Sequence, residues 1–399
     1  MASSIDKRSS GGNFSAGKII IFSLLPALLL FLLGYLGYGL FRSVRIYHYL
    51  KTDQPGWEGA VFRADPALGF APVPQSQGWQ INSGFKTPVR FDSRGFRIPL
   101  DADDQTPLKR PLLLALGCSF TFGHGINAED TFPFLVAKAL DGTALNAGLP
   151  TYGLAQMVIL AQRLIPQYKP DIVLVQFSSW LVDRGDWPFA ISYPGVVPIP
   201  YFVKSEGKLN ITRPAFITRN FDLPLAKYRH TPSRIGDFLS FLKQAGLPLI
   251  LYDDFQVLFF QARMLFKLVP APVHEIDRDQ VVDAAYRRIE RLCRENNAEM
   301  VVVFLHDPVT AEPSFAEISR LKALTYPIMV DPGPALLNRL PDHKAGTYYQ
   351  TYGHLRGSPP QVVDKHPNEL ANRIIATEIL KALGKNFVGP ENPPGQRAD

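Results

Sequence analysis

The sequence predicts an α/β protein in which a doubly wound parallel sheet follows one N-terminal membrane-spanning helix. Two observations support this prediction. Residues 19–41 form an almost unbroken apolar run without a charged side chain, and from Pro111 onward apolar strands alternate with segments of helical periodicity. About 20 apolar residues suffice to cross a bilayer, and such alternation is typical of parallel sheets with right-handed crossovers. With 399 residues, 46% of them apolar, the chain can bury a large core.

The N-terminal part combines a flexible tail with a membrane anchor. Residues 1–17 are rich in Ser and Gly, which predicts a tail without fixed structure. We expect residues 18–42 to be an uncleaved transmembrane signal anchor, because a cleaved signal peptide has a shorter apolar region and a small-residue exit. Equal numbers of Lys and Arg flank the two sides of the apolar run, so the positive-inside rule does not give its orientation.

The charge and cysteine content exclude several classes of function. Residues 1–51 hold six Lys or Arg against Asp6 alone, and the rest of the chain is nearly balanced. The net charge of +6 therefore belongs mostly to the membrane flanks, and we expect no nucleic-acid partner. The two cysteines, Cys118 and Cys293, make neither a disulfide framework nor a Cys-x-x-Cys site.

Residues 52–110 differ from the rest of the chain in amino-acid composition. They are rich in Gly, Pro and aromatic residues, with short stretches of alternating polarity. This composition predicts short strands and turns. We therefore expect a small β-rich collar between the membrane and the main domain.

The main domain is expected to extend over residues 111–385, with a second flexible tail at residues 386–399. Apolar runs predict its strands, and segments with helical periodicity predict its helices. The expected strands are 111–117, 143–146, 171–177, 299–305 and 328–330, and the expected helices are 130–140, 153–166, 281–297, 314–323 and 368–382.

Residues 183–278 interrupt this rhythm and are interpreted as an insertion. A hairpin is expected around Ser205, Glu206 and Gly207, where a turn signal separates two short alternating stretches. Residues 258–269 have the pattern of an amphipathic helix. Such a helix can lie on the membrane or cover an active site, but packing against the main sheet is the more common arrangement.

The best indication of chemistry is a serine set between glycines. Residues 116–125 read LGCSFTFGHG and follow the apolar run that begins at Pro111. A buried strand that turns sharply into a helix leaves the next side chain at the carboxyl edge of the sheet, where open α/β sheets bind ligands. Ser119 is therefore a candidate nucleophile, and the alternative is that it only caps a helix.

A second segment offers partners for this serine. Near the C-terminus, Asp364 and His366 are separated by one residue and are followed by Pro367 and an amphipathic helix. A serine nucleophile needs a neighbouring base, and the base needs a carboxylate that fixes its tautomer. Ser119, His366 and Asp364 could supply these three roles. The alternative is ordinary turn chemistry at a His-Pro step.

Together, these segments resemble the SGNH (GDSL-like) hydrolases, in particular their membrane-anchored bacterial branch. The resemblance covers about residues 111–179 and 299–383, in three ordered blocks that read LGCSFTFGHG, LNAGLPTYG and DKHPN. It implies a flavodoxin-like three-layer α/β/α sandwich, in which serine attacks an ester carbonyl and histidine acts as base and then as acid. It also implies an oxyanion hole built from the N–H groups of Ser119 and Gly148 and from an asparagine side chain of a further block.

The chain departs from that family pattern at the asparagine. Where the family has Asn-Asp, this sequence has Ser178, Ser179 and Trp180. A hydroxyl or the indole N–H could replace the missing donor, and Ser179 is the tentative choice. Asn146 is a further candidate, although it is expected rather to order the turn of the second block. Cys118 stands where many relatives have aspartate, and we interpret it as an inert buried side chain.

No cofactor and no metal site are expected. His124, His343 and His354 are expected in loops, and His306 follows a strand at the carboxyl edge of the sheet. None of them has a spacing typical of metal ligands.

The sequence therefore predicts a membrane-anchored serine esterase or O-acyl transferase that acts on an acylated envelope carbohydrate or lipid. The alternative is a non-catalytic envelope protein that binds glycan or helps polysaccharide assembly. The resemblance further implies a single-pass protein of the bacterial inner membrane, with its C-terminal domain in the periplasm.

Overall fold

The computed structural model describes residues 16–51, 56–82, 85–104, 106–184, 187–192, 195–205, 208–223, 227–228, 234–270, 278–305, 328–342 and 344–384. Most of the predicted N-terminal tail, the predicted tail 386–399 and the predicted helix 314–323 lie outside these residues.

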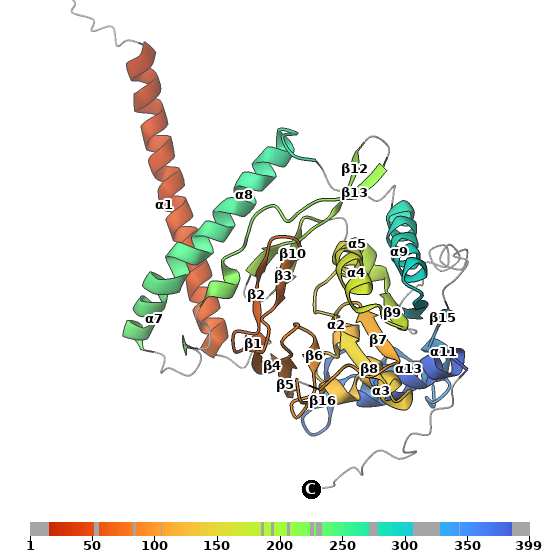
Figure 1. The fold of residues 1–399 in the computed structure, drawn as a ribbon. Coiled ribbons are helices and arrows are strands. Elements are labelled where there is room, and N and C mark those ends of the chain that lie inside the picture. Colours follow the sequence, from red (N-terminus) through yellow and green to blue (C-terminus); the bar gives the residue numbers. More distant parts are fainter. Residues whose placement is uncertain are drawn as a thin grey trace, which may run out of the picture.

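A nine-stranded sheet forms the centre of the molecule, in the order β1-β4-β5-β6-β8-β7-β9-β14-β15 (Figure 1). Its parallel part consists of β7 (Leu112–Leu116), β8 (Thr143–Asn146), β9 (Ile172–Phe177), β14 (Glu299–Phe304) and β15 (Ile328–Val330). These are the five predicted strands. In chain order they are arranged second, first, third, fourth and fifth, which is the order of a doubly wound sheet. The mixed α/β class is thereby confirmed.

Helices cover both faces of the parallel strands. One face carries α4 (Leu154–Tyr168) and α9 (Arg278–Glu295), and the other carries α3 (Phe132–Ala139) and α13 (Glu369–Ala382). Shorter elements lie around them, namely α2 (Ser119–Phe122), η1 (Ala128–Asp130), α5 (Ser179–Asp183), α11 (Gly333–Leu337), α12 (Ala345–Tyr352) and the β16 (His354–Arg356) and β17 (Gln361–Asp364) hairpin.

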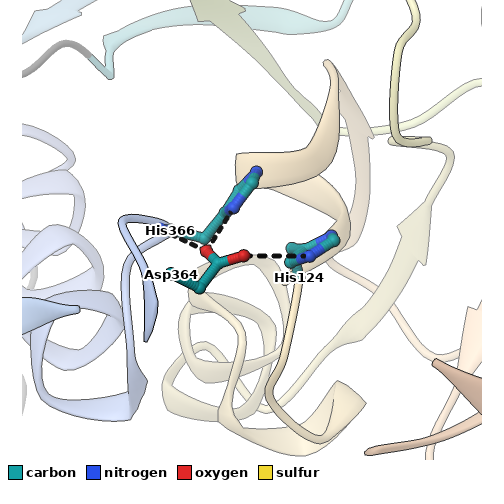
Figure 2. Close-up of side chains that lie close together, drawn as sticks. All are labelled: His124, Asp364 and His366. Atoms are coloured by element: carbon teal, nitrogen blue, oxygen red, sulfur yellow. Dashed lines mark hydrogen bonds and ion pairs between the residues drawn. The ribbon is translucent and has the colours of Figure 1, made fainter. Parts of the chain in front are cut away.

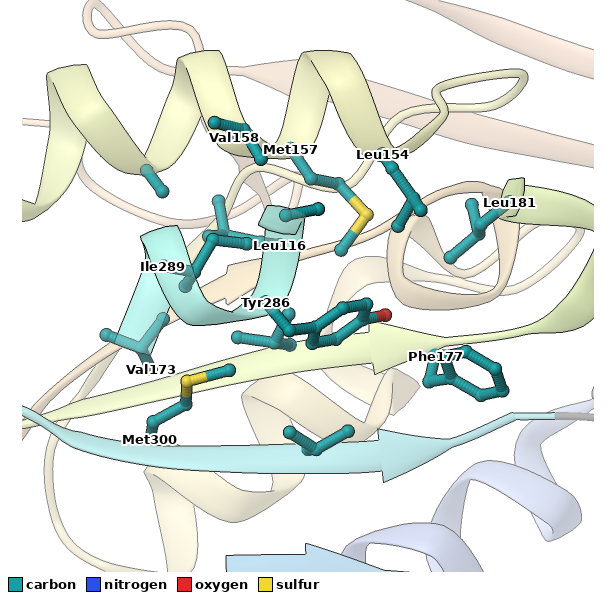
Figure 3. Close-up of a cluster of buried hydrophobic side chains, with 14 of the residues drawn as sticks. Leu116, Leu154, Met157, Val158, Val173, Phe177, Leu181, Tyr286, Ile289 and Met300 are labelled. Atoms are coloured by element: carbon teal, nitrogen blue, oxygen red, sulfur yellow. The ribbon is translucent and has the colours of Figure 1, made fainter. Parts of the chain in front are cut away.

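The core follows from the alternation of side chains along the strands. Leu114 and Leu116 of β7 pack with α4 and α9, whereas Leu113 and Ala115 pack with α3 and α13. All four side chains are fully buried. Figure 3 shows the first of these two layers, where Tyr286 of α9 lies among apolar side chains of the sheet and of α4.

Residues 52–110 are rich in strands, but they do not stand apart from the main domain. β1 (Gly56–Glu58), β4 (Gln77–Asn82), β5 (Phe85–Phe91) and β6 (Arg97–Ile98) extend the central sheet as antiparallel strands. Only the hairpin of β2 (Phe62–Asp65) and β3 (Gly69–Pro72) forms a separate small sheet. The expected collar is thus, for the most part, the edge of the sheet that carries the candidate site.

The N-terminal helix α1 (Ala16–Lys51) contains the predicted span. Its segment Leu24–His48 is long and apolar enough to cross a membrane, a test that a signal sequence would also pass.

The insertion forms small hairpins and one long helical arm. The hairpins are β10 (Phe189–Ser192) with β11 (Gly195–Pro198), and β12 (Phe202–Ser205) with β13 (Lys208–Ile211), the second at the predicted place. After η2 (Asn220–Asp222), the arm consists of α7 (Ile235–Phe241), the π-helical η3 (Leu242–Ile250) and α8 (Leu251–Leu265). Most of the expected helix 258–269 lies in α8. Its expected packing on the main sheet was wrong, because Phe260 of α8 packs with Tyr201 and Val203 of the insertion. The preceding η3 packs on α1.

Candidate active site

Ser119 lies at the carboxyl end of β7, the first strand of the doubly wound order. The chain leaves the buried strand through Gly117 and Cys118, and Ser119 opens the short helix α2. Connections from β7 and β9 run to opposite sides at this point of the sheet, which is where such sheets form ligand crevices. A side chain is excluded at position 117, since a Cβ there would overlap Thr121 Oγ1 and lie 2.5 Å from Gln176 Oε1.

Hydrogen bonds with the neighbouring strand β9, through Gln176, hold the turn that presents Ser119. Gln176 Oε1 accepts hydrogen bonds from Cys118 N at 2.9 Å and Thr121 Oγ1 at 2.8 Å, and its Nε2 donates to Ser178 Oγ at 2.8 Å. The side chain is buried, with 1% exposed. Because a buried amide with all these partners has one orientation, Gln176 holds the two strand ends in register.

The three residues expected to act together are brought together. His366 Nε2 lies 2.9 Å from Ser119 Oγ, and His366 Nδ1 lies 2.6 Å from Asp364 Oδ1. The same carboxylate oxygen also accepts the backbone N–H of His366 at 2.8 Å. Since Nδ1 faces a carboxylate, it carries the ring proton and leaves Nε2 free to accept the serine proton.

Asp364 is held by partners on its second oxygen as well (Figure 2). Asn82 Nδ2 of β4 donates to Asp364 Oδ2 at 2.7 Å, and His124 Nε2 lies 3.5 Å from the same atom. Burial acts to raise the pKa of this carboxyl, but hydrogen bonds from His124 and His366 and their positive charge when protonated outweigh burial and hold the pKa well below its usual range. Asp364 therefore stays ionised while it orients His366.

His124 is a second histidine of the site, from the loop that follows α2. Gln80 Oε1 accepts from Gly125 N at 2.9 Å, so its Nε2 faces His124 Nδ1 and donates to it. The ring proton of His124 is thereby assigned to Nε2, on the side of Asp364. Burial, and next the neighbouring His366, lower the pKa of His124 from 6.5 to about 4. A neutral ring thus lies against the candidate base.

The loop that carries His124 is anchored by a buried arginine. Arg97 of β6 donates to the carbonyls of Phe122, Gly123 and Ile126, and its guanidinium lies 4.2 Å from the centre of the Phe122 ring. Burial lowers the pKa of Arg97 to about 9, so it stays charged at neutral pH.

The residues after His366 fix where its loop ends. Asn368 caps α13 by accepting a hydrogen bond from Ala371 N at 3.1 Å, and its Nδ2 donates to the carbonyls of Thr351 and Gly353. A cap of this kind stabilises the helix by about 1 kcal/mol. The Pro-Asn pair thus sets the position from which His366 reaches Ser119.

The three residues predicted for the oxyanion hole differ in whether their donor groups are free to face a substrate at Ser119. Ser119 N–H lies at the start of a helix, where the helix offers no acceptor. Gly148 N–H instead donates to Asn146 Oδ1 at 3.1 Å, and Asn146 Nδ2 donates to Thr121 O at 2.8 Å. Asn146 therefore orders this turn, as expected. Ser179 opens α5 but does not line the cavity at Ser119.

The other possible donors after β9 are engaged elsewhere. Ser178 is buried, and its hydroxyl donates to the carbonyl of Leu305. Trp180 lines the cavity, but its Nε1 points to Cys118 Sγ at 3.5 Å. The assignment of a third oxyanion donor therefore stays a prediction.

Cys118 is placed as the sequence led us to expect. It is fully buried, and its Sγ accepts from Gln176 Nε2 at 3.1 Å. Burial acts to raise the pKa of the thiol, but the charge of Arg184 and hydrogen bonds from Trp180 and Gln176 outweigh burial and lower it. The sulfur is buried away from any substrate, so the lowered pKa does not make it a nucleophile.

His124, Asp364 and His366 also have the composition of a metal site, with their donor atoms within 4.8 Å of one another. Both ring nitrogens of His366 are, however, engaged by Asp364 and Ser119. His354 lies beside this group, with Nε2 3.1 Å from His124 O. His306 and His343 lie outside the described residues.

A cavity of about 240 Å³ opens over Ser119 and His366. Its wall is mostly aromatic, with two cationic side chains. The aromatic side chains are Phe120, Trp180, Tyr348, Tyr349 and Tyr352, and the cations are Arg184 and Lys365. A second, more open hollow of about 490 Å³ shares Tyr349, Lys365 and His366 with the first.

Sequence reasoning missed Gln80, Asn82, Arg97 and Gln176. Gln176 could have been noticed as a polar residue inside an otherwise apolar strand, because a buried amide needs partners. Gln80 and Asn82 carried no signal, since their role depends on strand pairing far from the nucleophile.

No family model and no curated protein matches the chain. Solved structures with some similarity include an acetyl xylan esterase from Butyrivibrio proteoclasticus, at 9% identity over 78% of this chain and 71% of that chain, with a TM-score of 0.35. A psychrotrophic esterase from Pseudoalteromonas is 9% identical over 69% of this chain and 97% of that chain, with a TM-score of 0.33. A GDSL-like lipase from Bacteroides thetaiotaomicron is 9% identical over 69% and 88%, with a TM-score of 0.32. These similarities are too slight to assign a family or an activity.

Proposed function

We propose that the chain is a membrane-anchored serine esterase or O-acyl transferase that acts on an acylated envelope carbohydrate or lipid. The observation that carries this proposal is the continuous line of contacts from Ser119 Oγ through the His366 ring to Asp364. Each member has the partner that its role needs, and the serine lines a cavity.

The reaction would proceed through an acyl-enzyme. Ser119 Oγ attacks the ester carbonyl carbon as His366 Nε2 takes the hydroxyl proton. The tetrahedral intermediate collapses when the same nitrogen gives that proton to the departing alcohol oxygen. Water or a sugar hydroxyl then gives its proton to His366 Nε2 as its oxygen attacks the acyl carbon. The bond between the acyl carbon and Ser119 Oγ breaks, the acid or a new ester leaves, and His366 Nε2 returns its proton to Ser119 Oγ. General acid–base catalysis of this kind contributes about 10²–10⁴-fold in rate.

The cavity favours a carbohydrate over a long acyl chain. Among the described residues that line it there is no Leu, Ile, Val or Met, the side chains that surround alkyl chains. Tyr and Trp rings can stack on sugar rings, and the hollow that shares His366 gives an acceptor a route to the base. This arrangement suits transfer as well as hydrolysis.

A fluorophosphonate probe on the purified full-length protein tests the proposal. Wild type and the surface control Ser93→Ala are expected to be labelled, and Ser119→Ala is expected to lose the label. Ser119→Ala should also lose turnover of p-nitrophenyl acetate. Equal rates for Ser119→Ala and wild type on that ester would contradict the proposal.

A second function has one observation in its favour. Gly148 N–H is engaged by Asn146, and Ser178 by Leu305, which leaves few donors for an oxyanion. A non-catalytic protein that binds glycan or helps polysaccharide assembly would tolerate this. An unlabelled wild type, with glycan binding that survives Ser119→Ala, would favour that function.

The proposal includes a location and a division of the chain. We propose an inner-membrane protein with its main domain, residues 111–385, in the periplasm. Protease added to spheroplasts should digest the domain, whereas full protection would place it in the cytoplasm.

A further inference from the structure

Helix α8 exposes an apolar stripe along its length. Phe255 and Phe259 are each 51% exposed, Leu265 is 79% exposed and Phe266 is 70% exposed. Together with Tyr252 and Leu258, these side chains are spaced by three, four and seven residues, so they lie on one face of the helix. Their exposure to water is unfavourable, because burial of apolar surface away from water is favourable.

The opposite face of α8 is already packed. Phe260 is buried against Tyr201 and Val203, and Met264 packs on the same cluster. Asp253 is buried and accepts hydrogen bonds from Thr218 and from backbone N–H groups of the insertion. The helix therefore packs on the protein with one side and exposes apolar side chains on the other. Such a helix is typical of a second, non-aqueous environment.

Contacts with α1 place α8 beside the membrane span. Tyr35 OH donates to the carbonyl of Leu251, and a Cβ at Gly39 would collide with the Leu251 side chain. Further along, Arg42 lies 3.8 Å from Asp254. Tyr35, Gly39 and Arg42 all belong to the apolar segment Leu24–His48. A bilayer that covers this segment must therefore reach the first turn of α8.

The arm crosses α1 at η3, and α8 continues from that crossing. In Figure 1, α8 then diverges from α1 at an angle and leads away from the central sheet. The acidic side chains of α8 are turned to protein partners, whereas Arg263 lies over the Phe259 ring, 5.9 Å from its centre. A cation at the edge of an aromatic stripe can extend to lipid phosphates while its stem stays in the apolar layer.

We propose that the exposed face of α8, from Tyr252 to Phe266, is embedded in the bilayer interface beside α1. The occupant of this face is lipid. The inference rests on the proposed membrane span of α1 and is independent of the ester chemistry. Two contacts with the membrane, at an angle to each other, would fix the orientation of the main domain, whereas a single helix would allow it to rotate.

Site-directed fluorescence in the full-length protein tests this inference. Both native cysteines are buried, at 0% and 2% exposure, so a bimane label reports an introduced cysteine. We would compare Phe259→Cys and Leu265→Cys on α8, Leu29→Cys on α1 and Lys381→Cys on α13, in vesicles of phosphatidylcholine and phosphatidylglycerol. Leu29 is 57% exposed and serves as the lipid reference, and the exposed Lys381 serves as the aqueous reference.

Labels on α8 and at position 29 should be quenched by doxyl lipids and protected from iodide, and the label at 381 should behave in the opposite way. If position 29 meets lipid while both α8 positions are quenched by iodide, the inference is wrong. If the α8 labels are shielded from both quenchers and cross-link between copies, a second copy covers this face, and the inference is equally wrong. A label at 29 open to iodide would overturn the proposed span together with this inference.

Discussion

The imidazole rings of His124 and His366 lie face to face, with centres 4.0 Å apart and planes inclined by 23°. Both rings approach Asp364, one on each carboxylate oxygen. Because the pKa of His124 is lowered to about 4, this ring is uncharged at neutral pH. His124 thus presents an uncharged aromatic ring to the candidate base His366.

Replacing His124 by Phe should therefore lower kcat without changing KM. The variant keeps a ring against His366 but loses the N–H toward Asp364 and the acceptor for Gln80. We expect kcat to fall about tenfold, equivalent to about 1.4 kcal/mol of barrier. KM should stay within twofold, because His124 does not line the cavity. His354→Phe, which leaves the Asp364 contacts intact, is the control. A wild-type kcat for His124→Phe would show that the second histidine has no role in catalysis.

The same histidine should make stability depend on pH. A group whose folded pKa is below its unfolded value of 6.5 binds fewer protons in the native state. Its contribution is complete above pH 6.5 and declines as the pH falls toward 4. The decline is on the order of 3 kcal/mol, at 1.36 kcal/mol for each pKa unit. Chemical unfolding in detergent at pH 4.5 and pH 7 measures it. His124→Phe should flatten this slope, and an unchanged slope would assign the effect to other groups.

A methyl group at position 117 should disrupt the serine turn. Gly117→Ala would push Thr121 and Gln176 apart, with a stability loss of about 1–3 kcal/mol for overpacking. Labelling of Ser119 should fall with it. Gly236→Ala in α7 is the matched control, because nothing lies within 4 Å of a Cβ there and alanine favours a helix. Similar unfolding midpoints for the two variants would show that the turn can relax.

Removing the buried cation at position 97 should loosen the loop after the nucleophile. Arg97→Met fills the space but removes the guanidinium donor from the carbonyls of Phe122, Gly123 and Ile126, which we expect to cost about 3 kcal/mol. Arg90→Met is the control, since Arg90 donates to Leu100 and Ala102 at the surface. Urea unfolding compares the two. Equal losses would mean that burial of the Arg97 contacts adds nothing.

The sequence predicted those parts of the fold and site that depend on residues close together in the chain. The apolar run of β7 and the helix after Asn368 have strong local signals, and Asp364 and His366 stand close together in the chain. Asn82 and Gln80 were not predictable, because their contacts arise from strands that pair across the sheet. The direction of α8 was also not predictable, since an apolar stripe does not say which surface it meets.

The pairing of β6 with β8 at Arg97 and Asn146 has a consequence for how the protein can be divided. The segment between the anchor and the nucleophile is not a spacer that could be shortened, exchanged or left out. It supplies the arginine that holds the loop of His124, and through Asn82 of β4 it supplies a donor to the Asp364 carboxylate. A fragment that begins at Pro111 would keep all three residues of the candidate triad and still lack part of its site.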